Sequence, residues 1–273
     1  MSITKAVILA AGEGSRMRPL TCSRPKVMLP LANKPILEHL LLEMRQAGIE
    51  DFIFIVGYRD EQIRNYFGDG AKWNVRIQYS NQRKQLGTAD ALRMVKDLLN
   101  ENFLMANGDI IINQQNIGGL MQQTGNAVSV IERENVTGLG VVEVRDGCVA
   151  RILEKTANPP SHLANAGLYL FSPAVFDAID KTEKSPRGEY EITDSIRILI
   201  ESGQKVACHV IDQWLDISYP WDLLNVNEKI MQDLKPQNSG EIEANAVIKG
   251  PVSVGEGTVV RAGSYIVGPV IIG

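Results

Sequence analysis

The chain has 273 residues, enough to bury one large core with or without a smaller appendage. Its formal net charge of −4 argues against electrostatic binding of nucleic acid. No apolar run is long enough to cross a membrane, and the N-terminus lacks the apolar core of a signal peptide. The 3 cysteines are widely separated, which is typical of a reducing cytoplasm and of neither a disulfide framework nor a zinc site.

The first predicted element is a buried strand that ends in a basic, glycine-containing loop. Residues 6–10 are uniformly apolar, and the loop that follows holds Gly12, Gly14, Arg16 and Lys26. Glycine lets a ligand approach backbone N–H groups, and the cations supply positive charge for phosphates. The motif lacks the third glycine of the dinucleotide fingerprint, which argues against an NAD-dependent enzyme. It also lacks the Gly-Lys-Ser/Thr of the P-loop.

Helical and strand patterns then alternate up to residue 235. The predicted elements are a helix from Pro35 to Gly48, a strand at 52–56, a helix over 89–98 with Thr88 as its N-cap, a strand at 103–106, strands at 128–131, 140–144 and 149–153 with a hairpin turn at 146–147, and helices at 192–200 and 223–234. This alternation predicts an α/β domain over residues 1–235, with a Rossmann-like, doubly wound and mostly parallel sheet.

The period of the sequence changes after a linker at residues 236–241. Within 242–273, a branched apolar residue recurs at every sixth position: Ile242, Ile248, Val254, Val260, Ile266 and Ile272. Such a hexapeptide period predicts a parallel β-helix with three short strands per coil, and it resembles the left-handed β-helix of acyltransferases. A solenoid this short leaves an apolar end uncovered, so we expect either a truncated chain or an end that another subunit covers, as in a homo-oligomer.

The N-terminal motif points to a family. Gly-x-Gly-x-Arg-x-x-Pro-Leu-Thr, followed by Pro25-Lys26 and Leu29-Pro30, resembles the signature of the sugar-1-phosphate nucleotidylyltransferases, with Ser15 where Thr is usual. The resemblance implies that an NTP and a sugar 1-phosphate give an NDP-sugar and pyrophosphate, with Mg²⁺ as cofactor. The thymidylyltransferase and bifunctional uridylyltransferase branches are the most similar. The resemblance therefore implies UTP or dTTP as the nucleotide, and glucose 1-phosphate or N-acetylglucosamine 1-phosphate as the sugar substrate.

This reaction needs cations and carboxylates rather than a nucleophile from the protein. A sugar 1-phosphate, whose second pKa is about 6, attacks unaided, whereas repulsion between anions and the charge of the leaving pyrophosphate must be relieved. The resemblance implies Arg16 and Lys26 as the catalytic cations. It implies Asp109, which follows a buried strand, and Asp216 as ligands of Mg²⁺. Asp222 is a lower-ranked alternative to Asp216, because it falls in the first turn of the last helix.

The resemblance also assigns residues to the two substrates. The nucleotide side comprises Leu9, Ala11, Gly12, Gly14, Gln82, Gly87, Thr88 and Gly108. The sugar-phosphate side comprises Gly140, Glu154, Lys155 and Asn165, supported by the segment 189–194.

Two of these assignments leave simpler alternatives open. The segment 82–89 resembles the base-recognition segment of the family, and it is alternatively a loop and helix cap without ligand contact. The pair 154–155 is alternatively an exposed ion pair. For the whole protein, the alternative is a non-catalytic paralogue that serves as a regulatory or scaffolding subunit. The presence of Lys26 and Asp109 counts against it.

Overall fold

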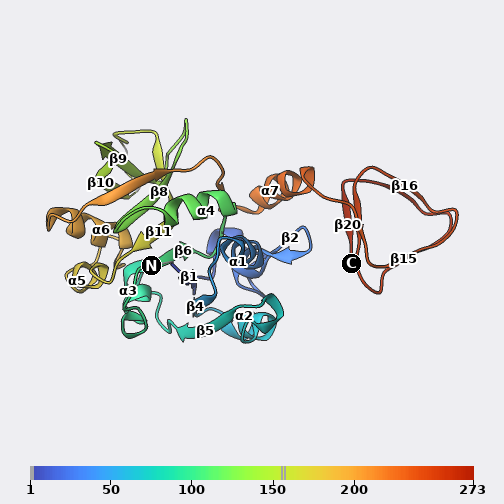
Figure 1. The fold of residues 1–273 in the computed structure, drawn as a ribbon, viewed down its shortest axis with the longest axis horizontal. Coiled ribbons are helices and arrows are strands. Elements are labelled where there is room, and N and C mark those ends of the chain that lie inside the picture. Colours follow the sequence, from blue (N-terminus) through green and yellow to red (C-terminus); the bar gives the residue numbers. More distant parts are fainter. Residues whose placement is uncertain (1–2, 155, 157) are drawn as a thin grey trace.

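A nine-stranded sheet forms the centre of the computed structural model, which describes residues 3–154, 156 and 158–273 (Figure 1). In spatial order its strands are β5 (Arg76–Asn81), β4 (Asp51–Val56), β1 (Lys5–Ala10), β6 (Phe103–Asn107), β11 (Leu163–Phe171), β8 (Asn126–Glu132), β12 (Val206–Val210), β10 (Cys148–Glu154) and β9 (Gly140–Arg145).

The prediction of a mostly parallel sheet is correct only for one half. Strands β5, β4, β1 and β6 are parallel, but β11 runs antiparallel to both β6 and β8, so the whole sheet is mixed. The other half contains the predicted β9–β10 hairpin, whose turn residues Asp146 and Gly147 have φ of 51° and 74°. A two-residue turn of this kind can join only antiparallel strands.

Helices cover both faces of the sheet. They are α1 (Ile36–Gln46), α2 (Asp60–Phe67), α3 (Thr88–Arg93), α4 (Gln114–Met121), α5 (Val175–Asp180) and α6 (Ile192–Glu201). The last helix, α7 (Pro220–Gln232), instead packs through Val226 against Leu29 and Leu31 in a separate cluster. Apolar residues of α1, α2 and α4 form one core cluster with Ile8, whereas those of α3, α5 and α6 form another with Val7. Neighbouring residues of β1 therefore pack into different cores, which explains its uniformly apolar sequence.

Two helix boundaries differ from the predictions by three residues or more. Helix α3 ends at Arg93 and is followed by a separate 3₁₀ turn over Lys96–Leu98. Helix α7 begins at Pro220, before the predicted start at Leu223, because proline is well suited to the first helical position. No helix among the described residues is long and apolar enough to span a bilayer.

Short elements position the loops around the sheet. The 3₁₀ turns η1 (Ser15–Met17) and η2 (Lys26–Met28) follow β1. The remaining short elements are η3 (Ala71–Trp73), η4 (Lys96–Leu98), the pair β2 (Pro30–Leu31) and β3 (Lys34–Pro35), and the pair β7 (Ile110–Ile111) and β13 (Leu215–Asp216).

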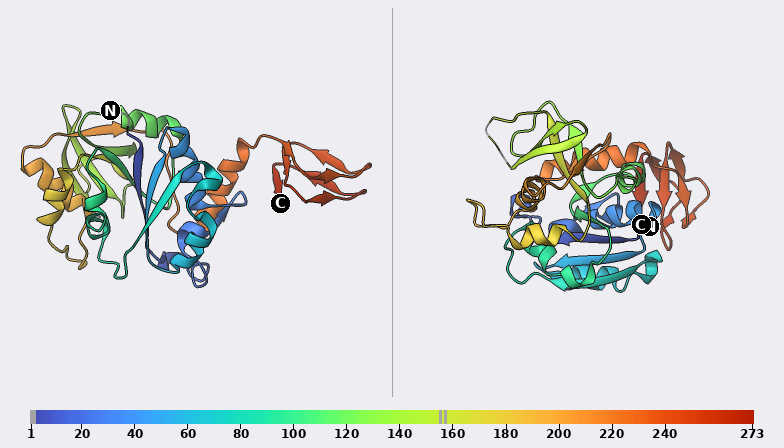
Figure 2. Two further views of the ribbon diagram at one scale, coloured as in Figure 1. Left: turned by 60° about the horizontal axis from the view of Figure 1, so that its bottom comes forward. Right: turned by 60° about the vertical axis from the view of Figure 1, so that its left-hand side comes forward.

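The tail after α7 folds into three short parallel sheets. They are β14 (Gln237–Asn238), β17 (Val252–Val254) and β20 (Val270–Ile272), then β15 (Glu241–Ile242) with β18 (Val259–Val260), and β16 (Val247–Lys249) with β19 (Tyr265–Val267). Residues paired between neighbouring strands, such as Val252 and Val270, lie three hexapeptides apart in the sequence. The first strand of the tail, β14, falls within the predicted linker. Figure 1 shows a triangular outline for this tail, and Figures 1 and 2 show it projecting from the end of α7. The left-handed β-helix stays a prediction.

The apolar stripe of the tail is only partly covered. Val254 and Val260 are buried, Ile248, Ile266 and Ile272 are half-buried, and Ile242 is 36% exposed. The residues in the middle of the stripe are thus shielded from both sides, whereas those near its ends have a neighbouring coil on one side only.

Candidate active site

Two adjoining cavities of about 370 and 230 Å³ lie beside the carboxyl ends of β1 and β6. They have five lining residues in common: Arg16, Thr88, Asn107, Asp109 and Ser218. The two cavities are therefore halves of a single cleft, placed where open α/β sheets bind their ligands.

The glycine loop brings its two predicted catalytic cations into this cleft. Gly14 has a φ of 77°, and a Cβ atom there would lie 2.6 Å from the Cβ of Lys26. Glycine is thus required both by the backbone conformation and by the close passage of the lysine. The carboxylate of Glu13 binds Arg18 at 2.6 Å and leaves Arg16 without an ion pair among the described residues. The Arg16 guanidinium instead lies 5.5 Å from the ring centroid of Tyr219.

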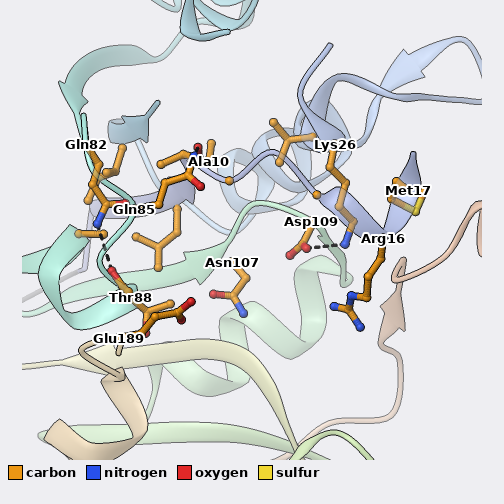
Figure 3. Close-up of a pocket in the computed structure, with 18 of the residues that line it drawn as sticks. Ala10, Arg16, Met17, Lys26, Gln82, Gln85, Thr88, Asn107, Asp109 and Glu189 are labelled. Carbon is orange, nitrogen blue, oxygen red and sulfur yellow. Dashed lines mark hydrogen bonds and ion pairs between the residues drawn. The ribbon is translucent and has the colours of Figure 1, made fainter. Parts of the chain in front are cut away.

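Lys26 is paired with the first predicted metal ligand. Its ammonium Nζ lies 2.6 Å from Oδ2 of Asp109, and the lysine side chain is only 9% exposed. Figure 3 shows this pair and Arg16 at one end of the larger cavity, with Gln82, Gln85 and Thr88 at the other. The cations are thus separated from the segment expected to bind the base.

Gly108 does not line the cleft, although it was predicted to bind nucleotide. Its N–H donates to the carbonyl oxygen of Leu9 at 2.9 Å, and a Cβ at this position would lie 2.8 Å from the same oxygen. The role of Gly108 is therefore to let β6 lie close to β1, which sets the position of Asp109.

The second carboxylate, Asp216, reaches the cleft through a short strand pair. It lies opposite Ile110 in the β7–β13 ladder, next to Asp109, and its Oδ2 accepts a hydrogen bond from the Ser218 hydroxyl at 2.6 Å. Asp222 has a different task, because its Oδ2 accepts from the N–H groups of Ser218 and Tyr219 at the start of α7. Of the two, only Asp216 lines the cleft within the described residues.

The predicted N-cap of α3 was wrong. Gly87 occupies that position with a φ of 111°, and Thr88 is the first helical residue. The Thr88 hydroxyl accepts a hydrogen bond from the N–H of Ile192 at 2.9 Å. A Cβ on Gly87 would lie 2.4 Å from the carbonyl oxygen of Tyr190, so only glycine permits this packing. Tertiary contact with the 190–192 segment thus replaces the local cap.

Gln82 and Gln85 connect the segment before α3 to its surroundings. Nε2 of Gln82 donates to the carbonyl oxygen of Gly87 at 3.1 Å and to Oδ2 of Asp90 at 2.9 Å. Nε2 of Gln85 donates to the carbonyl oxygen of Ala11 at 2.7 Å, which ties this segment to the glycine loop. Gln85 lines the larger cavity and was absent from the predicted site, although it stands within the predicted base-recognition segment.

The smaller cavity holds the predicted sugar-phosphate residues. Gly140 and Glu154 lie close together, since a Cβ on Gly140 would be 3.0 Å from Oε2 of Glu154. Nδ2 of Asn165 donates to the hydroxyl of Tyr169 at 2.7 Å, and burial raises the pKa of that phenol. The fourth predicted residue, Lys155, lies outside the described residues.

Sequence reasoning missed a cation at this end of the cleft. Arg187 donates to Oε1 of Glu191 at 2.5 Å and lies 3.6 Å from Oε1 of Glu154, so it links two carboxylates that line the smaller cavity. The only indication of Arg187 in the sequence was its position two residues before the segment 189–194, which was predicted to support the sugar-phosphate side.

The cleft gathers most of the predicted residues. Those that line it are Leu9, Ala11, Gly12, Gly14, Arg16, Lys26, Gln82, Gly87, Thr88, Asp109, Gly140, Glu154, Asn165 and Asp216.

Comparison with known proteins agrees with this architecture. A family model described as nucleotidyl transferase matches residues 5–233. The chain is 38% identical over 261 residues to the low-salt glycan biosynthesis nucleotidyltransferase Agl11 of Haloferax volcanii, covering 92% of this chain and 73% of that protein. It is 40% identical over 259 residues to the bifunctional protein GlmU of Methanococcus maripaludis, covering 94% of this chain but only 61% of GlmU. It is 36% identical over 281 residues to glucose-1-phosphate thymidylyltransferase of Streptomyces antibioticus, covering 98% and 78%.

Solved structures share the same fold. A Bacillus anthracis protein assigned as a glucose-1-phosphate thymidylyltransferase, in complex with sucrose, has a TM-score of 0.76 at 27% identity and covers 86% of this chain and 97% of its own. A UDP-glucose pyrophosphorylase in complex with UDP-glucose has a TM-score of 0.74 at 22% identity, covering 84% and 99%. The fold is therefore Rossmann-like α/β. Because the family model spans most of the chain, the protein belongs to the nucleotidyl transferase family, as its N-terminal motif predicts, and is an enzyme of the nucleotidyltransferase class.

Proposed function

We propose that the enzyme transfers a nucleotidyl group from UTP or dTTP to glucose 1-phosphate or N-acetylglucosamine 1-phosphate and releases pyrophosphate. The observation that carries this proposal is the division of one cleft into two halves. The glycine loop and the segment around Gln82 line the larger half. Residues of β9, β10 and β11 line the smaller half, and Arg16 and Asp109 belong to both. This is the arrangement that joining two phosphate-bearing substrates requires.

Arg16 and Lys26 supply the positive charge of the reaction. Lys26 is buried and held by Asp109, so its ammonium has a defined position at the shared boundary. Arg16 is exposed and lies over Tyr219, which leaves its five N–H donors available to phosphate oxygens. Fixed cations of this kind offset the repulsion between the attacking and the transferred phosphates and the charge that develops on pyrophosphate.

The carboxylates present fit a magnesium ion. Asp109 and Asp216 both line the smaller cavity, and Mg²⁺ is commonly held by one or two carboxylates together with substrate phosphates. No larger group of His, Cys, Asp or Glu that could hold a metal occurs in the part of the chain described. When bound there, Mg²⁺ would neutralise the transferred phosphate and help to orient it.

Gln82 favours a pyrimidine that carries a ring N–H. Both hydrogens of its amide nitrogen are donated within the protein, to Gly87 and Asp90, so only the oxygen remains for a ligand. Uracil and thymine offer an N–H at N3, whereas N3 of cytosine is an acceptor. The same edge is present in uracil and thymine, so the contact supports both UTP and dTTP. Among the relatives, the Streptomyces protein is named a thymidylyltransferase acting on glucose 1-phosphate.

The direct test is pyrophosphate release measured over a grid of the four common NTPs and several sugar 1-phosphates, with Mg²⁺ present. We expect release with UTP or dTTP paired with glucose 1-phosphate or N-acetylglucosamine 1-phosphate. Absence of release with every pair would overturn the proposal and favour a regulatory or scaffolding paralogue.

A further inference from the structure

Asp90 is the only side chain among the described residues that hydrogen-bonds to Gln82, yet it lines neither half of the cleft. It stands in the first turn of α3, and its Oδ2 lies 2.9 Å from Nε2 of Gln82. The second partner of Nε2 is the carbonyl oxygen of Gly87, at 3.1 Å. Carboxylate and carbonyl oxygens can only accept, so both partners require the nitrogen of the amide on their side.

This pairing determines which atom of Gln82 is left over. Rotating the amide by half a turn would place Oε1 against two oxygens and lose both hydrogen bonds. Gln82 as a whole is only 5% exposed. Its Oε1 accepts no hydrogen bond from the described residues, but this atom is still in contact with solvent. Because Gln82 lines the larger cavity, this oxygen is the group that the side chain offers there.

We propose that Asp90 is a positioning residue that sets the base specificity of the enzyme. By holding Nε2 of Gln82, it keeps Oε1 directed to the cleft, where it accepts from the N3–H of uracil or thymine and repels N3 of cytosine. The inference rests on the proposed function, because it assumes that Gln82 reads the base. Asp90 itself touches no substrate.

The carboxylate contributes more to this selection than the backbone carbonyl does. A hydrogen bond to an ionised acceptor is roughly twice as strong as one between neutral groups. An asparagine at position 90 would remove the charge and add its own donor, which a rotated Gln82 amide could satisfy. The rotated amide would present Nε2 to the cleft, and that group donates to N3 of cytosine.

The experiment compares Asp90→Asn with Asp97→Asn. Asp97 is exposed and lies in the 3₁₀ turn after α3, so its substitution removes the same charge at a control position. For each variant, kcat/KM is measured for UTP, dTTP and CTP, with the sugar 1-phosphate that the wild type prefers as the second substrate. Where CTP is not turned over, its inhibition constant is measured instead of kcat/KM. In Asp90→Asn we expect the preference for UTP over CTP to fall by about tenfold, mainly through KM. Asp97→Asn should keep the wild-type preference.

A second pair of variants separates positioning from a general effect on folding. If Asp90 acts through Gln82, then Asp90→Asn should not change base preference in a Gln82→Ala background. An unchanged preference in the single Asp90→Asn variant, or an equal change in both backgrounds, would overturn the inference. Failure of the proposed function looks different, because the wild type would then release no pyrophosphate from UTP or dTTP with any sugar 1-phosphate.

Discussion

The ammonium Nζ of Lys26 lies 2.6 Å from Oδ2 of Asp109, although 83 residues separate the two in the chain. The lysine is almost fully buried, whereas the aspartate side chain is 33% exposed on the wall of the cleft. This pair joins the glycine loop after β1 to the end of β6, so the proposed catalytic cation and the proposed metal ligand are positioned by each other. Loss of either partner leaves the other unpaired at the place where the phosphates would bind.

Asp109→Ala should abolish turnover without unfolding the protein. The side chain belongs to none of the hydrophobic clusters, so its removal leaves the packing of both sheet faces unchanged. Pyrophosphate release at saturating Mg²⁺ and the far-UV circular dichroism spectrum check the two parts. Near-wild-type activity in this variant would contradict its assignment as a metal ligand.

Arg16→Ala and Lys26→Ala should mainly lower kcat. The decrease for each variant should correspond to a loss of about 2.7–4 kcal/mol of transition-state stabilisation. Arg18→Ala is the matched control, because Arg18 lies in the same loop but is paired with Glu13 and lines neither cavity within the described residues. Steady-state kinetics of all three variants decide the matter. An effect confined to KM for the sugar 1-phosphate would show that these cations do not act on the transferred phosphate.

Asp216→Asn and Asp222→Asn should separate function from stability. The first removes a cleft carboxylate and should reduce turnover strongly with little change in melting temperature. The second weakens the acceptor for two N–H groups at the start of α7 and should cost about 1 kcal/mol of stability, with a smaller effect on turnover. Thermal melts and pyrophosphate assays on both variants provide the check, and the reverse pattern would make Asp222 the second metal ligand.

Gly14→Ala should destabilise the protein more than Gly125→Ala does. Both glycines have positive φ, of 77° and 74°, so an alanine is strained at either position by about 1 kcal/mol or more. Only at Gly14 would the new Cβ meet a neighbour, at 2.6 Å from Lys26, whereas no heavy atom lies within 4 Å at Gly125. Denaturant unfolding of the two variants measures the difference. Equal losses would mean that Lys26 moves away from the new methyl group at no cost in stability, and would contradict this prediction.

We propose that the tail joins copies of this chain into a homo-oligomer, as its uncovered apolar stripe predicts. Among the described residues, the tail sheets pair only with one another, and a single side-chain hydrogen bond, from Nδ2 of Asn33 to the carbonyl oxygen of Ile271, joins the tail to the main domain. Removing the residues after Gly240 should therefore lower the oligomeric state measured by light scattering, while pyrophosphate release is largely retained. A full-length chain that is monomeric at micromolar concentration would disprove this proposal.

Features that depend on neighbouring residues could be predicted from the sequence. The apolar run of β1, the turn at Asp146-Gly147 and the six-residue period of the tail each express a local rule of burial or backbone geometry. The glycine loop belongs to the same group, because the φ that Gly14 adopts and the charges of Arg16 and Lys26 are properties of one short segment. These local features were sufficient to indicate a phosphate-binding α/β protein and its family.

Only the tertiary structure decided which distant residues act together. Strand order decided that β11 runs antiparallel to β6. Contacts between loops and elements decided the pairing of Lys26 with Asp109, the different roles of Asp216 and Asp222, and the hydrogen bond from Gln82 to Asp90. The cap of α3 shows the physical reason. Thr88 has the side chain of an N-cap, but its hydroxyl accepts from Ile192, because a hydrogen-bonding group takes the partner that the packed chain brings nearest, whatever its distance in sequence.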